Sequence, residues 1–260
     1  MRTVLVIGIG AGDPEQITVQ AIRAINRAEV VFVTEKGSEA DELADRRRRM
    51  LERYVEPGRH PRVVSLPDPP RDRAADDYHE AVERWRDGRA ALWGEAIADA
   101  LRPGAAGAFL VWGDPCLYDG TIDVLERIRR RPDMALELEV IPGITSAQAL
   151  AARHRIAWNR IGGAVQITTG RRLAAGMPAG AEDVLVLLDG RCAFAQLAEE
   201  DLEIYWGAYV GTEDEILVSG PLSRVTERIL RLREQARARK GWIMDAYLLR
   251  RAPSRAPARR

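Results

Sequence analysis

The sequence predicts an α/β protein of two α/β domains, with a parallel five-stranded N-terminal sheet and a mixed C-terminal sheet. The first evidence is the apolar run Val4-Leu5-Val6-Ile7, which ends at glycines and is typical of a strand buried on both faces. The second is a strand, a turn, a helix and a second strand between Thr3 and Thr34, a βαβ unit that pairs its strands in parallel. The third is a change of pattern after Pro142, where the expected strands become shorter and more mixed.

Five strands are expected in the N-terminal domain, because five apolar runs are bounded by turn residues. They cover residues 3–9, 30–34, 63–66, 108–112 and 136–141. Helices should separate them. The first carries Ala21, Ile22, Ile25 and Ala28 on one face; the others are expected at 41–54, at 72–101 with a break or kink near Gly88, and at 121–131.

The C-terminal half alternates helices with short strands. Strands are expected at 165–168, 184–188, 204–210, 216–219 and 242–248, and helices at 146–154, 194–201 and 222–239. The predicted domains are therefore residues 1–143 and 144–250. Residues 251–260 contain only Arg, Ala, Pro and Ser, which cannot build a core, so a disordered tail is expected there.

Charge and composition exclude several classes of protein. Lys plus Arg and Asp plus Glu both number 39, so no global field attracts nucleic acid or a membrane, and an anionic ligand must meet a local patch. The run Arg46-Arg47-Arg48-Arg49 could form such a patch, but a solvated helix face is the favoured interpretation.

Cysteine and histidine usage points to a cytoplasmic protein without a metal site. Cys116 and Cys192 are far apart, which favours a reducing compartment. No Cys or His pair has the spacing of metal ligands, and no apolar run is long enough to cross a bilayer.

A glycine-rich turn, Gly8-Ile9-Gly10-Ala11-Gly12-Asp13-Pro14, follows the first expected strand. Such a turn lets a ligand approach the backbone closely and serves dinucleotides, phosphates and S-adenosylmethionine alike. A dinucleotide fingerprint requires a sixth-position glycine where this chain has Asp13, although Glu35 stands where a ribose-binding acid is expected. No Gly-Lys-Ser or Gly-Lys-Thr follows, which excludes a P-loop.

Two further turns follow expected strands. The second is Trp112-Gly113-Asp114-Pro115-Cys116-Leu117-Tyr118, and the third is Val140-Ile141-Pro142-Gly143-Ile144-Thr145-Ser146. The carboxyl ends of parallel strands meet at one edge of a sheet, so the three turns should converge on one site.

Together these motifs resemble the S-adenosylmethionine-dependent tetrapyrrole (corrin/porphyrin) methyltransferases. That family has a Gly-x-Gly-Pro-Gly-Asp-Pro turn, then Gly-Asp-Pro-x-x-Tyr, then Val-Pro-Gly-Ile-Thr-Ser. All three occur here in the same order, over residues 1 to 250, with Ala11 in place of the usual proline. The resemblance implies the tetrapyrrole methylase fold, a homodimer, and a cofactor cleft between the two domains.

The resemblance also implies site residues. Contacts to S-adenosylmethionine are expected at Gly10, Ala11, Trp112, Gly113, Asp114, Leu117, Thr145, Ser146, Leu188 and Gly211. Finer similarity, in stretches such as Ile167-Thr-Thr-Gly-Arg-Arg172 and Leu188-Asp-Gly-Arg-Cys-Ala-Phe194, points to the members that act in cobalamin (vitamin B12) biosynthesis by methylating precorrin-5 at C-1 and releasing acetate, which gives precorrin-6A.

Methyl transfer to an electron-rich carbon needs orientation more than a strong base, but acetate release needs a steered water molecule. By position, the candidate catalytic residues are Asp114, Glu35 and His154. The substrate carries many carboxylates, and Arg171 and Arg172, after an expected strand, are the candidate clamps.

Three alternatives remain open from the sequence. A sibling methyltransferase could act on another ring carbon of a precorrin or uroporphyrinogen. An NAD-dependent oxidoreductase could use Gly8, Gly10, Gly12 and Glu35. A non-catalytic ligand-binding module would keep the turns without a substrate clamp.

Overall fold

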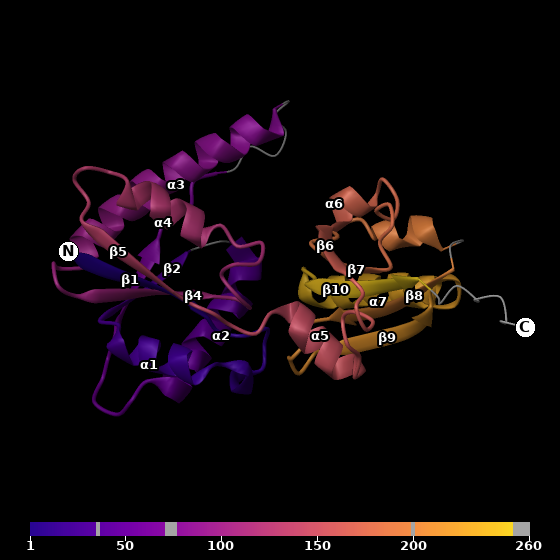
Figure 1. The fold of residues 1–260 in the computed structure, drawn as a ribbon. Coiled ribbons are helices and arrows are strands. Elements are labelled where there is room, and N and C mark those ends of the chain that lie inside the picture. Colours follow the sequence, from indigo (N-terminus) through magenta and orange to yellow (C-terminus); the bar gives the residue numbers. More distant parts are fainter. Residues whose placement is uncertain (35–36, 71–76, 199–200, 252–260) are drawn as a thin grey trace, which may run out of the picture. The chain divides into compact units, whose positions relative to one another are not determined.

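The computed structural model describes residues 1–34, 37–70, 77–198 and 201–251 (Figure 1). Internal contacts divide the chain into two compact units, an N-terminal unit of residues 1–145 and a C-terminal unit that begins at Ser146. Glu35 and nearly all of the expected tail lie outside the described residues. No helix in the described part of the chain is long and apolar enough to cross a membrane.

The N-terminal unit contains a five-stranded parallel sheet, as the sequence predicts. Its strands are β1 (Arg2–Gly8), β2 (Val30–Thr34), β3 (Arg62–Leu66), β4 (Ala106–Val111) and β5 (Leu136–Ile141), in the spatial order β3-β2-β4-β1-β5. The central strand β1 pairs with β4 on one side and β5 on the other, and residues 4–7 are fully buried.

Helices cover both faces of this sheet (Figure 1). They are α1 (Val19–Arg27), α2 (Gly37–Tyr54), α3 (Tyr78–Ala100) and α4 (Thr121–Arg129), with a short 3-10 helix η1 (Pro14–Gln16) after the first turn. Val4 and Val6 pack in one apolar cluster with α3 and α4, whereas Leu5 and Ile7 pack in a second cluster with α1 and α2. Successive side chains of β1 thus point into two cores, which explains its uninterrupted apolar sequence.

Helix α3 runs through Gly88 without the expected break. A single glycine costs a helix only about 1 kcal/mol. The buried residues Arg89, Trp93 and Ile97 follow it directly and fix this half of the helix against the sheet, so packing outweighs the local preference.

The C-terminal unit contains a mixed five-stranded sheet. Its strands are β6 (Val165–Thr169), β7 (Asp183–Leu187), β8 (Leu202–Ala208), β9 (Ile216–Pro221) and β10 (Asp245–Arg251), in the order β6-β7-β10-β8-β9. Only β6 and β7 pair in parallel. Its helical elements are α5 (Ser146–His154), α6 (Gly170–Leu173), η2 (Ala193–Leu197) and α7 (Leu222–Lys240).

Three expectations for this unit are wrong in detail. Strand β8 ends at Ala208 because Tyr209 takes a left-handed backbone with φ 49°. Strand β10 begins only at Asp245, since the preceding residues 242–244 bond to Tyr209 instead, through the carbonyls of Trp242 and Met244. The helix expected at 194–201 is the 3-10 helix η2, and residues 199–200 lie outside the described chain.

Candidate functional site

Three glycines from three turns pack backbone against backbone at the carboxyl edge of the N-terminal sheet. Gly8 ends β1, Gly113 follows β4, and Gly143 follows β5. A Cβ atom on Gly143 would lie 2.2 Å from the carbonyl oxygen of Gly113, and one on Gly8 would lie 2.6 Å from the nitrogen of Gly143. No larger residue fits without moving backbone, and the expected convergence of the three turns is confirmed. We call this contact the glycine junction.

Hydrogen bonds fix the first two turns to each other. The Gly113 N–H donates to the Gly10 carbonyl at 2.8 Å, and the Gly10 N–H donates back to the Gly113 carbonyl at 3.3 Å. Both residues have a positive φ, 85° for Gly10 and 70° for Gly113, which favours glycine.

Asp114 fixes the second turn to the third. Its Oδ2 accepts a 2.7 Å hydrogen bond from the N–H of Gly143, and its Oδ1 accepts one of 2.7 Å from the N–H of Cys116. The carboxylate is partly buried and satisfies two backbone donors that would otherwise lack a partner. Two backbone N–H groups therefore fix its position.

The first turn is closed by residues of η1. The N–H of Ala11 donates to Oε1 of Gln16 at 3.1 Å, and the Ala11 side chain is buried. Asp13 caps η1, since its Oδ1 accepts the N–H of Glu15 at 2.9 Å. Alanine in place of the family's proline thus leaves an ordered turn.

Trp112 carries a buried polar atom without a partner in the part of the chain that the structure describes. Its indole Nε1 makes no hydrogen bond there, and the neighbouring residue is Gly113 of the junction. A buried N–H without an acceptor is costly, so it marks a place where a ligand atom would bind favourably. Leu117 on the second turn and Thr145 on the third turn are partly buried, and Ser146 begins α5.

The turn after β7 holds Leu188 in a strained and exposed position. Leu188 has a φ of 56° and a side chain that is 66% exposed, which is unusual for leucine on both counts. The next residue, Asp189, is buried and anchors the turn: it accepts the N–H of Arg191 at 3.1 Å, the N–H of Ala193 at 2.7 Å and the hydroxyl of Tyr247 at 2.6 Å.

The turn after β8 holds Gly211, whose φ is 80°. The Gly211 N–H donates to Oε2 of Glu215 at 2.9 Å, and Oε1 of the same carboxylate pairs with Arg153 of α5. Leu188 and Gly211 therefore each lie on a turn fixed by a poorly exposed carboxylate.

The three candidate catalytic residues do not all belong to one unit. Asp114 belongs to the N-terminal unit and His154 to the C-terminal unit, and Glu35 lies outside the described residues. The Nε2 of His154 donates to the carbonyl of Trp206 at 3.0 Å, and burial lowers the pKa of this imidazole. The candidate clamps Arg171 and Arg172 lie on the four-residue helix α6, with exposed side chains.

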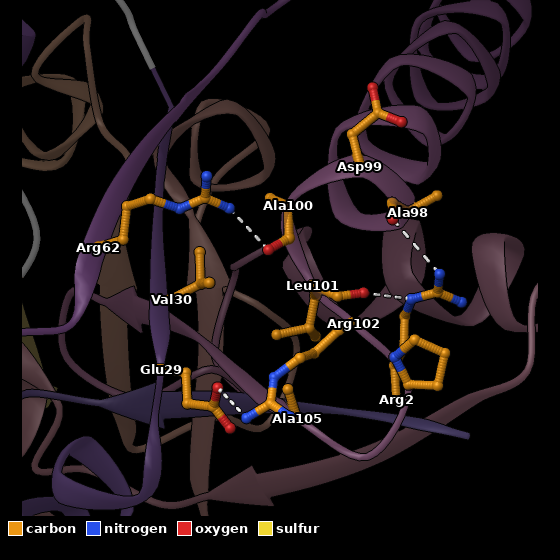
Figure 2. Close-up of a pocket in the computed structure, with 11 residues that line it drawn as sticks. Arg2, Glu29, Val30, Arg62, Ala98, Asp99, Ala100, Leu101, Arg102 and Ala105 are labelled. Carbon is orange, nitrogen blue, oxygen red and sulfur yellow. Dashed lines mark hydrogen bonds and ion pairs between the residues drawn. The ribbon is translucent and has the colours of Figure 1, made fainter.

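A hollow of about 470 Å³ lies at the opposite edge of the N-terminal sheet, among the amino ends of its strands (Figure 2). Arg2 donates to the carbonyls of Ala98 and Leu101, and Arg62 donates to that of Ala100 at 2.7 Å, so both guanidiniums cap the end of α3. Ligands of open α/β sheets bind at the carboxyl edge, and the glycine junction is there instead.

Sequence reasoning missed two residues near the junction. Arg46 and Arg47 of α2 are partly buried, Arg46 lies 5.8 Å from the centre of the Trp112 ring, and Arg47 donates to the carbonyl of Leu110 at 2.9 Å. The expected solvated helix face is correct for Arg48 and Arg49 and wrong for these two. In a run of four arginines no apolar residue marks the buried face, so the helical period that places Arg46 and Arg47 on another face than Arg48 and Arg49 is not visible in the sequence.

Comparison with known proteins identifies relatives across nearly the whole chain. The family model of the tetrapyrrole (corrin/porphyrin) methylases matches residues 3–226. A precorrin-6A synthase (deacetylating) from a Sinorhizobium species is 48% identical over 250 residues, which cover 96% of this chain and 95% of the relative. A precorrin-2 C(20)-methyltransferase from the same genus is 29% identical over 54% of this chain and 53% of its own length.

Solved structures give the same result. A cobalamin synthesis related protein from Corynebacterium diphtheriae superposes with a TM-score of 0.82 and 38% identity, over 96% of this chain and 98% of its own. The uroporphyrin-III C-methyltransferase of Thermus thermophilus, solved with S-adenosylhomocysteine, has a TM-score of 0.56 and 18% identity over 95% of this chain and 91% of its own, and so shares the fold.

Proposed function

Because this chain belongs to the family of tetrapyrrole (corrin/porphyrin) methylases, we infer that it is an S-adenosylmethionine-dependent C-methyltransferase of cobalamin biosynthesis. Its reaction is the methylation of precorrin-5 at C-1 with release of acetate, giving precorrin-6A. The observation that carries this assignment is the 48% identity to a precorrin-6A synthase (deacetylating) over 96% of the chain. A partial match of 29% to a precorrin-2 methyltransferase favours the sibling reaction less, and nothing comparable supports the oxidoreductase alternative.

The residues at the carboxyl edge of the N-terminal sheet fit an S-adenosylmethionine site. The bound methyl donor supplies an electrophilic carbon on sulfur. The glycine junction holds the backbone of Gly10, Ala11 and Gly113 together at this edge, and the unpartnered indole N–H of Trp112 offers a hydrogen-bond donor. Further contacts are proposed for Asp114, Leu117, Thr145, Ser146, Leu188 and Gly211.

Orientation and exclusion of water account for the methylation step in this proposal. The macrocycle carbon attacks in line, so no residue has to remove a proton before the new bond forms. The fixed backbone of the junction supports this role, because Asp114 and the Gly10–Gly113 hydrogen bonds allow little movement.

Acetate release adds water to the extruded acetyl carbonyl and breaks the carbon–carbon bond, so one residue must orient that water and accept its proton. Asp114, Glu35 and His154 are the proposed candidates. Both oxygens of Asp114 already accept one hydrogen bond, but a carboxylate oxygen can accept a second. The lowered pKa of His154 favours its neutral form, which can accept a proton.

Arg171 and Arg172 are proposed to bind substrate carboxylates, and their exposure on α6 is compatible with that role. A homodimer in the cytoplasm is proposed for the enzyme, as the family resemblance implies.

Calorimetric titration with S-adenosylhomocysteine tests the assignment, with NAD as the control. The purified protein is first denatured and its released small molecules are identified by mass spectrometry, since a retained cofactor would mask binding. Saturable binding of S-adenosylhomocysteine and none of NAD is expected. Incubation with methyl-labelled S-adenosylmethionine and precorrin-5 should then yield labelled product and acetate in equal amounts. Methylation without acetate would instead indicate a sibling reaction.

A further inference from the structure

The arginine run of α2 divides into an outward and an inward pair. Arg48 and Arg49 are exposed, and Arg48 pairs with Asp45. Arg46 and Arg47 are partly buried and approach residues at the end of β4. Two adjacent guanidiniums therefore lie beside the strand whose next residues are Trp112 and Gly113 of the glycine junction.

Arg47 is anchored by one end of its guanidinium. Its Nε donates at 2.9 Å to the carbonyl of Leu110, which is the penultimate residue of β4. Among the residues that the structure describes, its two Nη groups have no hydrogen-bond partner, and the exposed carboxylate of Asp119 interacts with it electrostatically. Burial lowers the pKa of Arg47 and Asp119 raises it, but the side chain keeps its charge at physiological pH.

The surroundings of Arg47 favour an anion. The guanidinium of Arg46 lies 5.8 Å from the centre of the Trp112 ring, and the buried Trp112 Nε1 has no described acceptor. The next arginine near Asp119, Arg89, is already neutralised by Asp68 at 2.7 Å. Among the described residues, the exposed Asp119 is thus the carboxylate that offsets the charge of Arg47, and both Nη groups of Arg47 are left to donate to a ligand.

We propose that Arg47, with Arg46 and Trp112 beside it, binds a carboxylate side chain of the tetrapyrrole substrate. This inference rests on the proposed function. A guanidinium whose Nε is occupied still presents its two Nη groups, which can donate in parallel to one carboxylate. Leu110, which anchors Arg47, lies on the same strand that leads to Gly113 of the junction, where the methyl donor is proposed to bind. Arg47 would therefore position the macrocycle relative to the methyl donor.

Arg47→Gln and the matched control Arg49→Gln separate this role from a structural one. We expect Arg47→Gln to raise the KM for precorrin-5 at least tenfold, as expected for loss of a charged hydrogen bond. Its kcat, its KM for S-adenosylmethionine and its Kd for S-adenosylhomocysteine should change less than about twofold. Arg49→Gln, on the exposed side of the same helix, should behave like the wild type. An unchanged KM for precorrin-5, or an equal weakening of both ligands, would overturn the proposal.

Arg47→Lys is the second variant, because lysine keeps the charge and can still donate to the Leu110 carbonyl, which protects folding if glutamine does not. Lysine lacks the two parallel N–H donors of a guanidinium, so we expect the KM for precorrin-5 to rise at least threefold. A wild-type KM in a folded Arg47→Lys enzyme would contradict bidentate binding.

A binding assay without turnover distinguishes this inference from the proposed reaction. Uroporphyrin III, a stable tetrapyrrole polycarboxylate, is titrated by fluorescence against the wild type, Arg47→Gln and Arg49→Gln. We expect only Arg47→Gln to lose affinity, tenfold or more. If the wild type binds S-adenosylhomocysteine and uroporphyrin but does not methylate precorrin-5, the proposed reaction fails and the carboxylate site stands. Equal affinities for all three proteins would refute the site.

Discussion

The carboxylate of Asp114 accepts a 2.7 Å hydrogen bond from the backbone N–H of Gly143, although the two residues lie 29 positions apart in the sequence. This bond joins the turn after β4 to the turn after β5. With the paired Gly10 and Gly113 backbones it makes the three turns one rigid unit. A ligand at this edge therefore meets backbone groups that are positioned before it binds, which reduces the entropy lost on binding.

Asp114→Ala should weaken S-adenosylhomocysteine binding more than tenfold and lower the stability of the protein. The substitution leaves the N–H groups of Gly143 and Cys116 without their acceptor, at a cost of about 1–3 kcal/mol each where they stay buried. Calorimetry and thermal unfolding measure the two effects. The control is Asp99→Ala, an exposed acid at the opposite edge of the sheet. Wild-type affinity in the Asp114 variant would place the cofactor elsewhere.

Gly143→Ala should abolish S-adenosylhomocysteine binding or prevent folding. The new methyl group would lie 2.2 Å from the carbonyl oxygen of Gly113 and 2.8 Å from Gly8, and neither backbone can move without breaking the junction. Gly120→Ala is the matched control, since its Cβ would meet no atom within 4 Å and its φ is −101°. Circular dichroism and calorimetry compare the two variants. If both bind alike, the close packing of the three turns is not required for function.

The parallel sheet and its three turns could be predicted from the sequence because their signals are local. A run such as residues 4–7 is apolar on every residue only when both faces are covered, and glycines directly after strands mark the edge where turns converge. The hydrogen bond of Asp114 to Gly143 could not be predicted in the same way. Asp-Pro is also a common turn, and its partner depends on which strands are neighbours in space.

The sequence prediction failed for some residues because tertiary contacts determine where they lie. Arg46 and Arg47 look like half of a solvated charge run, and only the packing of α2 on β4 shows that they face inward. The left-handed backbone of Leu188 could not be predicted either, and the next residue, Asp189, is held by Tyr247, 58 positions away. No short sequence motif marks such side chains, and their contacts come from residues that are distant in the sequence.

His154 should make the protein less stable as the pH falls. Burial lowers the pKa of this imidazole below its usual value near 6.5. The unfolded chain then binds a proton more readily, so stability is full above about pH 6.5 and declines until the folded-state pKa is passed. Thermal unfolding between about pH 5 and 8 should show a smaller decline for His154→Gln than for the wild type. His60→Gln, which removes an exposed histidine, serves as the control, and parallel curves for all three would exclude this effect.

Arg89→Ala should destabilise the N-terminal unit by about 3–5 kcal/mol, because it removes the guanidinium that pairs with the largely buried carboxylate of Asp68. Arg89 makes two hydrogen bonds to Asp68, at 2.7 and 3.3 Å, and its guanidinium lies 4.4 Å from the ring centres of both Trp85 and Trp93. Urea unfolding measures the loss. The control Arg84→Ala removes an exposed pair with Glu80 on the same helix and should cost far less. Similar midpoints for the two variants would refute the structural role of this cluster.

Tyr247→Phe tests whether the turn at Leu188 is part of the cofactor site. The Tyr247 hydroxyl donates to Asp189 at 2.6 Å, and burial together with Asp189 raises its pKa so far that it stays protonated. Its loss removes one of three donors to Asp189 and should cost about 1–3 kcal/mol of stability. The turn is then less firmly held, and Leu188 leaves its strained backbone more readily. We therefore expect S-adenosylhomocysteine affinity to fall several-fold by calorimetry.

The matched control is Tyr205→Phe, which removes a partly buried hydroxyl that donates to Glu203 at 2.9 Å in the same sheet. It should leave affinity unchanged, because among the described residues neither Tyr205 nor Glu203 is hydrogen-bonded to the turn after β7. A Tyr247→Phe protein that is less stable but binds S-adenosylhomocysteine as tightly as the wild type would exclude Leu188 from the site. Lower affinity in Tyr247→Phe alone would mean that Asp189 holds the strained backbone of Leu188 in its binding conformation before the ligand arrives. The free energy of folding would then offset the strain, and the ligand would not have to do so on binding.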